Sequence, residues 1–227
     1  LLDSAITLAP KDPDLFAHRA LALNRSGAPE LARADLEKAF GLSGNHANTF
    51  ANQAGIMLSV GNPAEAETAI NQAIRNNNKV AAFYAERGAL HAAQSNFVLA
   101  RIDYDSALLL DPNDQELWFN RGLVNEKINQ PALALEDYRY AITLDETYRQ
   151  AWFMSGSVLL KQGKFSESIE DFTMALNLAP DYAACYHNRG IAYFKSGHRQ
   201  AACKDWNSAV EFKFDLSVQM LEKHCRN

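Results

Sequence analysis

The side chains able to carry out chemistry are scattered along this sequence of 227 residues. The six His residues occupy unrelated positions, and neither an HExxH pair nor a His/Asp/Glu cluster at metal-ligand spacing appears. No GxSxG or GxGxxG segment is present, and Gly163-Lys164 lacks the Ser or Thr that follows the Lys of a phosphate-binding loop. The sequence therefore predicts no enzyme active site, no metal and no cofactor.

The three Cys residues leave two interpretations open. Cys203 and Cys225 fall at similar heights on two helices that we expect to be antiparallel neighbours, so a disulfide between them would attach the last helix of the chain. Cys185 falls at a core position. Because Cys is readily buried as a small apolar residue, we favour buried free thiols over the disulfide.

One charged pattern recurs along the chain: an Arg is followed by an Asp at a constant spacing. We predict that the two side chains form buried or half-buried bidentate ion pairs that join the two helices of one repeat, which is a structural role. Pairing between successive repeats is the alternative. The predicted pairs are Arg19 with Asp35, Arg87 with Asp103, Arg121 with Asp137, and Arg189 with Asp205.

The elements that must position these residues repeat every 34 residues. Counted from residue 13, position 27 of every full repeat is Ala, position 8 is small, position 4 is aromatic and position 24 is large. The six full repeats are 13–46, 47–80, 81–114, 115–148, 149–182 and 183–216. Residues 1–12 form a half repeat that precedes them, and residues 217–227 form a capping helix that follows.

Each repeat is expected to form two helices. Positions 4, 8 and 11, and then 20, 24 and 27, place small and large residues on one stripe of each helix. Gly at position 15 of four repeats permits the positive φ of a tight turn between the helices. Because no repeat can bury its stripe alone, the repeats must stack into a continuous core.

This pattern resembles that of the tetratricopeptide repeat family over essentially the whole chain. Segments such as Phe119-Asn120-Arg121-Gly122 look like those of bacterial arrays. The resemblance implies an all-α fold, a right-handed α-α superhelix that forms a single solenoid over residues 1–227. It also implies a concave face, lined by the first helix of each repeat, on which a peptide binds.

The resemblance places side chains of repeats four to six on that concave face. Phe119 and Phe153 are expected to anchor an extended or helical peptide, and Asn120 and Asn188 to hold its backbone. A row of Lys along the edge favours a peptide with some acidic character. The predicted groove residues are Phe119, Asn120, Leu123, Lys127, Phe153, Met154, Ser157, Lys161, His187, Asn188, Ile191 and Lys195. The alternative is that some of them pack against neighbouring first helices.

Composition narrows the class of partner. The formal net charge of −5 argues against a nucleic-acid binder, which needs a basic face. No apolar run approaches the roughly 18–20 residues that a membrane span requires. The predicted partner is therefore a protein or peptide.

Three functions remain open at this stage. We favour a non-enzymatic scaffold for protein–protein interactions. The chain is alternatively the targeting or regulatory arm of a larger enzyme whose catalytic domain lies outside residues 1–227. A third possibility is self-assembly, as a homo-oligomer formed through the N-terminal half repeat. As the compartment, the cytoplasm is preferred to the periplasm.

Overall fold

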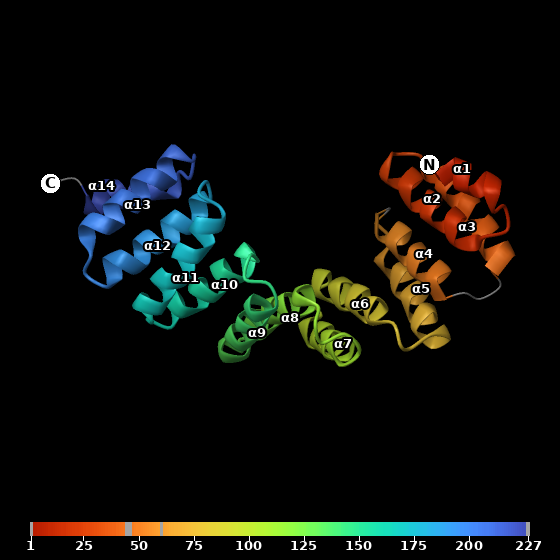
Figure 1. The fold of residues 1–227 in the computed structure, drawn as a ribbon, viewed down its shortest axis with the longest axis horizontal. Helices are drawn as coiled ribbons and strands as arrows, with labels where there is room; N and C mark the ends of the chain where they lie inside the picture. The colour runs from red at the N-terminus through yellow and green to blue at the C-terminus, as the bar shows by residue number, and fades with distance from the viewer. Residues whose placement is uncertain (1, 44–46, 60, 226–227) are drawn as a thin grey trace. The chain divides into compact units, whose positions relative to one another are not determined.

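The computed structural model describes residues 2–43, 47–59 and 61–225, and every regular element in these ranges is an α-helix (Figure 1). The first seven are α1 (Leu2–Leu8), α2 (Pro13–Arg25), α3 (Pro29–Ser43), α4 (Ala47–Ser59), α5 (Pro63–Asn76), α6 (Ala81–Ala93) and α7 (Phe97–Leu110). The next seven are α8 (Gln115–Lys127), α9 (Pro131–Leu144), α10 (Arg149–Lys161), α11 (Phe165–Leu178), α12 (Ala183–Lys195), α13 (Arg199–Glu211) and α14 (Leu216–His224). Each full repeat therefore contains a first and a second helix in the expected order.

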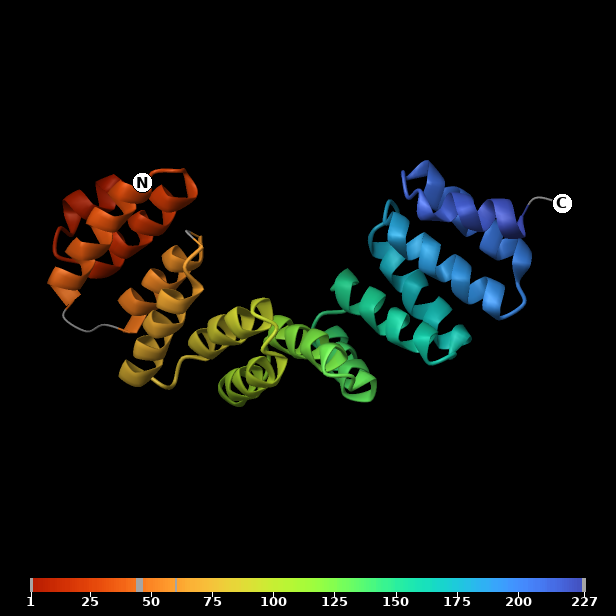
Figure 2. The ribbon, with the colours of Figure 1, turned by 180° about the vertical axis from the view of Figure 1, so that it is seen from behind.

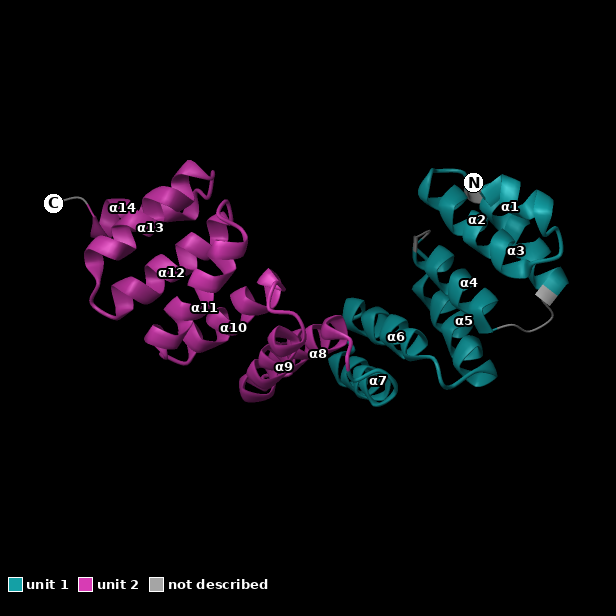
Figure 3. Cartoon of the chain, viewed as in Figure 1, with its two compact units in different colours: residues 1–112 teal, residues 113–227 magenta. Residues whose placement is uncertain are grey.

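The chain divides into two compact units, residues 1–112 and residues 113–227, which we call unit 1 and unit 2 (Figure 3). Unit 1 contains α1 to α7, and unit 2 contains α8 to α14. Within each unit the two helices of a repeat pack closely on one another, and the pairs stack in chain order, as the view from behind also shows (Figure 2). The single solenoid over residues 1–227 stays a prediction.

The turn between the two helices of a repeat has a positive φ at position 15. Gly27, Gly61, Gly163 and Gly197 have φ between 76° and 87°, a range in which Gly has no Cβ penalty. Asn129 takes the same role with φ of 60°. Ser95 does so as well, with φ of 64°, although its residue type gave no signal for it.

The core is built from the small and large positions that define the repeat. The Ala residues at position 27 are fully buried in all six repeats. At position 8, a Cβ on Gly122 would lie 2.6 Å from Cε1 of Tyr138, and one on Gly190 would lie 2.5 Å from Nε1 of Trp206. Because Tyr138 and Trp206 are fully buried, these glycines allow the two helices of a repeat to approach with a large ring between them.

The C-terminal helix α14 packs on α13 and is covalently attached to unit 2. Cys203 of α13 and Cys225, which follows α14, form a disulfide, so our preference for free thiols is wrong for this pair. A backbone contact adds to the attachment, since Nε of Arg199 donates a hydrogen bond to the carbonyl oxygen of His224. Local sequence pattern could not decide this, because the approach of the two sulfurs depends on how α14 docks on α13.

Cys185 is buried in the core, as its position predicts. Its thiol donates to the carbonyl oxygen of Phe172, at 3.3 Å. Burial raises the pKa of Cys185 to about 12, so the group stays a neutral thiol at physiological pH. It therefore has a packing role.

Candidate functional site

The four predicted Arg–Asp pairs are formed, and each joins the first and second helix of one repeat. In the first repeat, Nε of Arg19 lies 2.6 Å from Oδ2 of Asp35. In the sixth repeat, Nε of Arg189 lies 2.7 Å from Oδ2 of Asp205. Both carboxylates are buried, so each depends on its guanidinium for compensation.

The third and fourth repeats hold their carboxylates still deeper in the core. Asp103 is 2% exposed and Asp137 is 3% exposed, so neither carboxylate is open to solvent or to a ligand. Nη2 of Arg87 lies 2.6 Å from Oδ1 of Asp103, and Nη2 of Arg121 lies 2.6 Å from Oδ1 of Asp137. Each of these two carboxylates therefore contacts an Arg of the first helix of its own repeat.

Asp103 and Asp137 differ from the prediction in one respect: each has a second partner on the first helix, besides its Arg. Nδ1 of His91 lies 2.9 Å from Oδ2 of Asp103. Nδ2 of Asn125 donates to Oδ2 of Asp137 at 2.7 Å. The simple ion pair is thus an incomplete description of both sites, because one guanidinium does not satisfy all the lone pairs of a buried carboxylate.

Sequence analysis missed the roles of His91 and Asn125. The two residues share position 11 of their repeats, where the other four full repeats carry Leu, Met or Tyr. A polar residue at a core position, one helical turn after the Arg, was the available signal. Both side chains are buried and turned to a carboxylate, so they stabilise the junction of two helices.

The guanidinium groups of Arg19, Arg87 and Arg189 also reach the second helix of the preceding repeat. Nη1 of Arg19 lies 2.7 Å from Oδ1 of Asp3. Nη1 of Arg87 donates to Oδ1 of Asn71 at 2.7 Å, and Nη1 of Arg189 donates to Oγ1 of Thr173 at 3.0 Å. These three acceptor residues share position 25 of their repeats. One side chain therefore connects three helices and sets the register of adjacent repeats.

The fifth repeat forms the same site with an Arg from a different helix. Asp171 is buried, but the residue at the Arg position of its own repeat is Ser155. Nη1 of Arg139, at position 25 of the preceding repeat, lies 2.9 Å from Oδ1 of Asp171. The Arg139 guanidinium lies 5.8 Å from the ring centre of Trp152, as the other guanidiniums lie over the aromatic residue at position 4.

Sequence analysis also missed the role of Arg139. The available signal was a cation at position 25, where all the other repeats carry a side chain with an oxygen acceptor, in the repeat that precedes the missing Arg. Burial raises the pKa of Asp171, and the charge of Arg139 opposes that rise. These pairs connect helices, and nothing in their geometry indicates proton transfer to a ligand.

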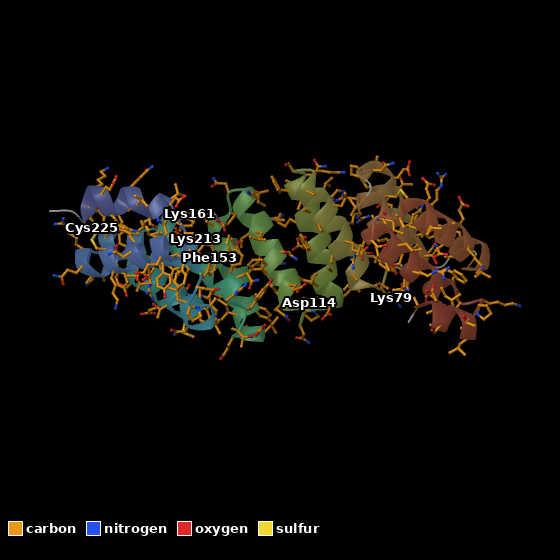
Figure 4. All side chains as sticks on the ribbon, turned by 90° about the horizontal axis from the view of Figure 1, so that it is seen from above. Lys79, Asp114, Phe153, Lys161, Lys213 and Cys225 are labelled. Atoms are coloured by element: carbon orange, nitrogen blue, oxygen red, sulfur yellow. A yellow bond between two sulfur atoms is a disulfide. The ribbon has the colours of Figure 1, made fainter. Side chains whose placement is uncertain are left out.

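The two aromatic residues expected to anchor a peptide are half-buried in unit 2. The Phe119 ring centre lies 5.0 Å from that of Tyr148 and 5.6 Å from that of Tyr138. The Phe153 ring centre lies 4.8 Å from that of Tyr182 and 5.8 Å from that of Phe172. Each ring thus packs on its own repeat and leaves part of its surface accessible on α8 or α10, where Figure 4 labels Phe153.

Several other predicted groove residues have partners within unit 2. Nζ of Lys161 lies 2.8 Å from Oε2 of Glu126. Nδ1 of His187 lies 2.8 Å from Oγ of Ser217, and burial lowers the pKa of this imidazole. The Ser157 hydroxyl donates to the carbonyl oxygen of Phe153 at 2.8 Å. Packing residues complete this group: Leu123 and Met154 lie against the buried cluster of Ala134, Tyr138 and Val158.

Four polar groups of the predicted groove remain available. Within the described ranges, the side-chain amides of Asn120 and Asn188 have no hydrogen-bond partner, and the ammonium groups of Lys127 and Lys195 have no ion-pair partner. Asn120 and Asn188 are half-buried, as is Ile191, whereas both Lys side chains are exposed. We call the surface formed by α8, α10 and α12 around these residues the first-helix face of unit 2.

A hollow of about 520 Å³ lies in unit 1, outside the residues predicted to bind. It is lined by Leu21, Arg25, Ala51, Asn52, Ala54, Gly55, Leu58, Ile70, Glu86, Ala89 and Leu90. Small residues occupy the first-helix positions of repeats two and three, where repeats four to six carry larger ones, and this difference leaves the space open. The small residue types were visible in the sequence, but the prediction followed the larger ones.

Each unit is a stack of helical hairpins, and the first helices of the hairpins form a surface on it. Stacked hairpins of this kind are typical of proteins that serve as scaffolds. Models of tetratricopeptide repeats match residues 58–115 and 88–155, and a model of the TPR repeat matches residues 156–197. The chain belongs to the tetratricopeptide repeat family. No curated protein matches the sequence.

Solved structures share the fold at low sequence identity. PilF of Pseudomonas aeruginosa is 17% identical with a TM-score of 0.80, over 94% of this chain and 98% of that one. YrrB, a TPR protein with an unusual peptide-binding site, is 23% identical with a TM-score of 0.72, over 82% and 97% of the two chains. MamA is 19% identical with a TM-score of 0.71, over 81% and 98%. The expected fold class, an all-α tetratricopeptide solenoid, is confirmed.

The family and fold support a protein-interaction scaffold, and tetratricopeptide repeat proteins typically have no catalytic activity. Among the described residues, none of the helices combines the length and apolar character needed to cross a membrane.

Proposed function

We propose that this chain is a scaffold that binds a segment of a partner protein on the first-helix face of unit 2. The observation that carries the proposal is the pair of amides of Asn120 and Asn188. They stand at the same position of repeats four and six, half-buried beside apolar surface and with no side-chain partner among the described residues. An amide offers both a donor and an acceptor, which is what a peptide backbone requires.

The apolar and charged neighbours of these amides support the same ligand. Phe119 is in the repeat of Asn120, and Phe153 is in the repeat between the two amides. The accessible parts of both rings provide apolar contact. Lys127 and Lys195 are exposed cations at one shared position of repeats four and six. An extended or helical segment with apolar side chains and some acidic character is therefore the expected partner.

The test compares partner capture by the wild-type chain and by the double variant Asn120→Ala/Asn188→Ala. Two lost hydrogen bonds of about 1 kcal/mol each predict a loss of affinity of roughly tenfold or more. The amides are better targets than Phe119 and Phe153, because those rings also pack against Tyr148 and Tyr182. Proteins captured from a lysate of the source cells are quantified by mass spectrometry and then tested individually.

The matched control is Asn177→Ala/Gln200→Ala, which removes two exposed amides from the second helices α11 and α13. This control is expected to retain the partners of the wild-type chain. Equal capture by wild type and by Asn120→Ala/Asn188→Ala, with circular dichroism showing both to be folded, would contradict the assignment of the site.

A further inference from the structure

The hollow of unit 1 has an apolar floor. Leu21 of α2, Gly55 and Leu58 of α4, and Ala89 and Leu90 of α6 contribute to its lining. Its volume of about 520 Å³ falls in the range of sites that take small ligands or a few amino-acid side chains. Water in such a hollow gains little from its apolar walls, so an apolar side chain that displaces the water is favoured.

Three polar side chains line the same hollow, and each has a different chemistry. Arg25 lies in the last turn of α2, Asn52 in the first half of α4 and Glu86 in the first half of α6. In the part of unit 1 that the structure describes, none of the three forms a side-chain hydrogen bond or ion pair. A cation, an amide and a carboxyl group thus face one apolar space without internal partners.

The surroundings of Glu86 disfavour the charged form of its carboxyl group when no ligand is bound. The side chain stays exposed on the open side, but the protein around it hinders hydration of the charge, which raises the pKa of Glu86 to about 7. A ligand cation beside this carboxyl group would restore the lost stabilisation of the charged form. Arg25 offers the complementary interaction to a ligand carboxylate.

We propose that this hollow is a second binding site, which takes a short peptide segment with an aliphatic side chain between a basic and an acidic residue. The aliphatic side chain occupies the floor, the basic residue pairs with Glu86 and the acidic residue pairs with Arg25. Asn52 holds the peptide backbone through its amide. The site lies wholly in unit 1 and is independent of Asn120 and Asn188.

The experiment selects peptides from a random phage-displayed library on the whole chain. The wild-type chain is expected to enrich sequences in which Leu, Ile, Val or Met stands between a basic residue, Lys or Arg, and an acidic residue, Asp or Glu. Ala89→Trp, which places an indole in the hollow from an exposed position of α6, is expected to abolish this enrichment. Ala93→Trp is the matched control, because Ala93 is exposed on the same helix and is not part of the lining.

A synthetic peptide of the enriched sequence is then titrated by fluorescence polarisation. Its affinity is expected to fall at least tenfold for Glu86→Gln and for Arg25→Gln, and to stay unchanged for Ala93→Trp and for Asn120→Ala/Asn188→Ala. Selection on Glu86→Lys is expected to replace the basic residue by an acidic one.

Three outcomes would overturn the proposal: no enrichment by the folded wild-type chain, full binding by Ala89→Trp, or binding that is lost in Asn120→Ala/Asn188→Ala. The last result would place the peptide on the first-helix face of unit 2. It would thereby support the proposed function while it excludes the second site.

Discussion

At the scale of single residues, the same electrostatic site is formed by residues from different helices. In four repeats the buried Asp pairs with an Arg of its own first helix, whereas Asp171 pairs with Arg139 of the preceding second helix. The position of the guanidinium, between a buried carboxylate and an aromatic ring, is retained while its origin in the chain changes. A buried carboxylate is destabilising unless a cation compensates its charge, and that cation can come from any neighbouring helix.

Removal of Arg139 tests whether the buried Asp171 depends on its ion pair for stability. Arg139→Ala leaves the buried Asp171 without a cation. Because the Arg139 side chain is 40% exposed, we expect the free energy of unfolding to fall by less than the roughly 3–5 kcal/mol that breaking a fully buried pair costs. Arg33→Ala is the control, since Arg33 and Glu37 form an exposed pair on one helix, worth less than about 0.5 kcal/mol. Urea denaturation followed by circular dichroism measures both changes.

The rescue variant Arg139→Ala/Ser155→Arg places the cation where the other repeats have it. It is expected to recover part of the lost stability. If Arg139→Ala is no more destabilising than Arg33→Ala, Asp171 does not depend on this ion pair.

Glu86 predicts a specific dependence of stability on pH. Its pKa is about 7 in the folded chain against an ordinary value of 4.5, so the folded state binds this proton more tightly than the unfolded state. The contribution of Glu86 to stability therefore falls as pH rises from about 4.5 to 7 and is constant above that range. Glu86→Gln is expected to remove this fall.

Urea midpoints of the wild type and Glu86→Gln between pH 5 and pH 8 measure the effect. Glu136→Gln is the control, because Glu136 is an exposed carboxyl group on α9. The difference in midpoint between wild type and Glu86→Gln should change across this range, and the Glu136→Gln profile serves as the reference for removal of a carboxyl group elsewhere in the chain. Parallel profiles for all three chains would contradict the raised pKa.

At the scale of helices, close approach between the two helices of a repeat depends on a missing Cβ. Tyr138 fills the space above Gly122 so completely that a methyl group at Gly122 would lie 2.6 Å from the ring. Helix propensity alone would favour Ala over Gly at this interior position. Packing therefore overrides propensity where two helices enclose a large side chain.

Gly122→Ala tests whether packing against Tyr138 outweighs the higher helix propensity of Ala. We expect it to lower the free energy of unfolding by about 1–3 kcal/mol, because the buried Tyr138 ring must move. Gly41→Ala in α3 is the matched control, since no atom lies within 4 Å of the added methyl group there. That change is expected to be neutral or to stabilise by up to about 1 kcal/mol. Equal effects of the two substitutions in thermal denaturation would show that the contact with Tyr138 is not limiting.

At the scale of the whole molecule, each compact unit contains hydrophobic clusters of its own among the described residues. The clusters around Ile70, Leu36 and Phe16 lie in unit 1, and those around Phe172, Tyr138 and Ile142 lie in unit 2. Each unit thus has a core of its own, in addition to the nearest-neighbour packing that stabilises any repeat array.

The clusters inside unit 2 predict that residues 113–227 fold without residues 1–112. The fragment is expected to show a helical circular dichroism spectrum and cooperative thermal unfolding, because its helices pack on one another and the Cys203–Cys225 disulfide attaches α14 to α13. The full chain measured under the same conditions is the control. A fragment that is largely unfolded would instead support one continuous solenoid over residues 1–227.

The repeat period alone determined much of this structure. One register of 34 residues defines the helix pairs, the turns at Gly27 and Gly163, and the buried Ala at position 27. The Arg–Asp pairs followed from the same register, because both residues belong to one repeat and hold a constant separation in sequence. Such features depend on local geometry, which spacing along the chain describes directly.

The period did not reveal the second partners of two carboxylates. His91 beside Asp103 and Asn125 beside Asp137 occur in only two of the six repeats, so no recurrence marked them. They fill a core position that is apolar or aromatic in the other repeats. The contacts of His91 and Asn125 follow from the burial of Asp103 and Asp137, because a buried carboxylate needs hydrogen-bond donors, and the tertiary structure shows this burial.

Only the tertiary structure decided the features that depend on contact between repeats. Three such features involve side chains that are far apart in the sequence. They are the disulfide between Cys203 and Cys225, the ion pair of Arg139 with Asp171, and the hollow that Glu86 lines. These distances are set by how each repeat stacks on the next, and a residue period carries no information on that packing geometry.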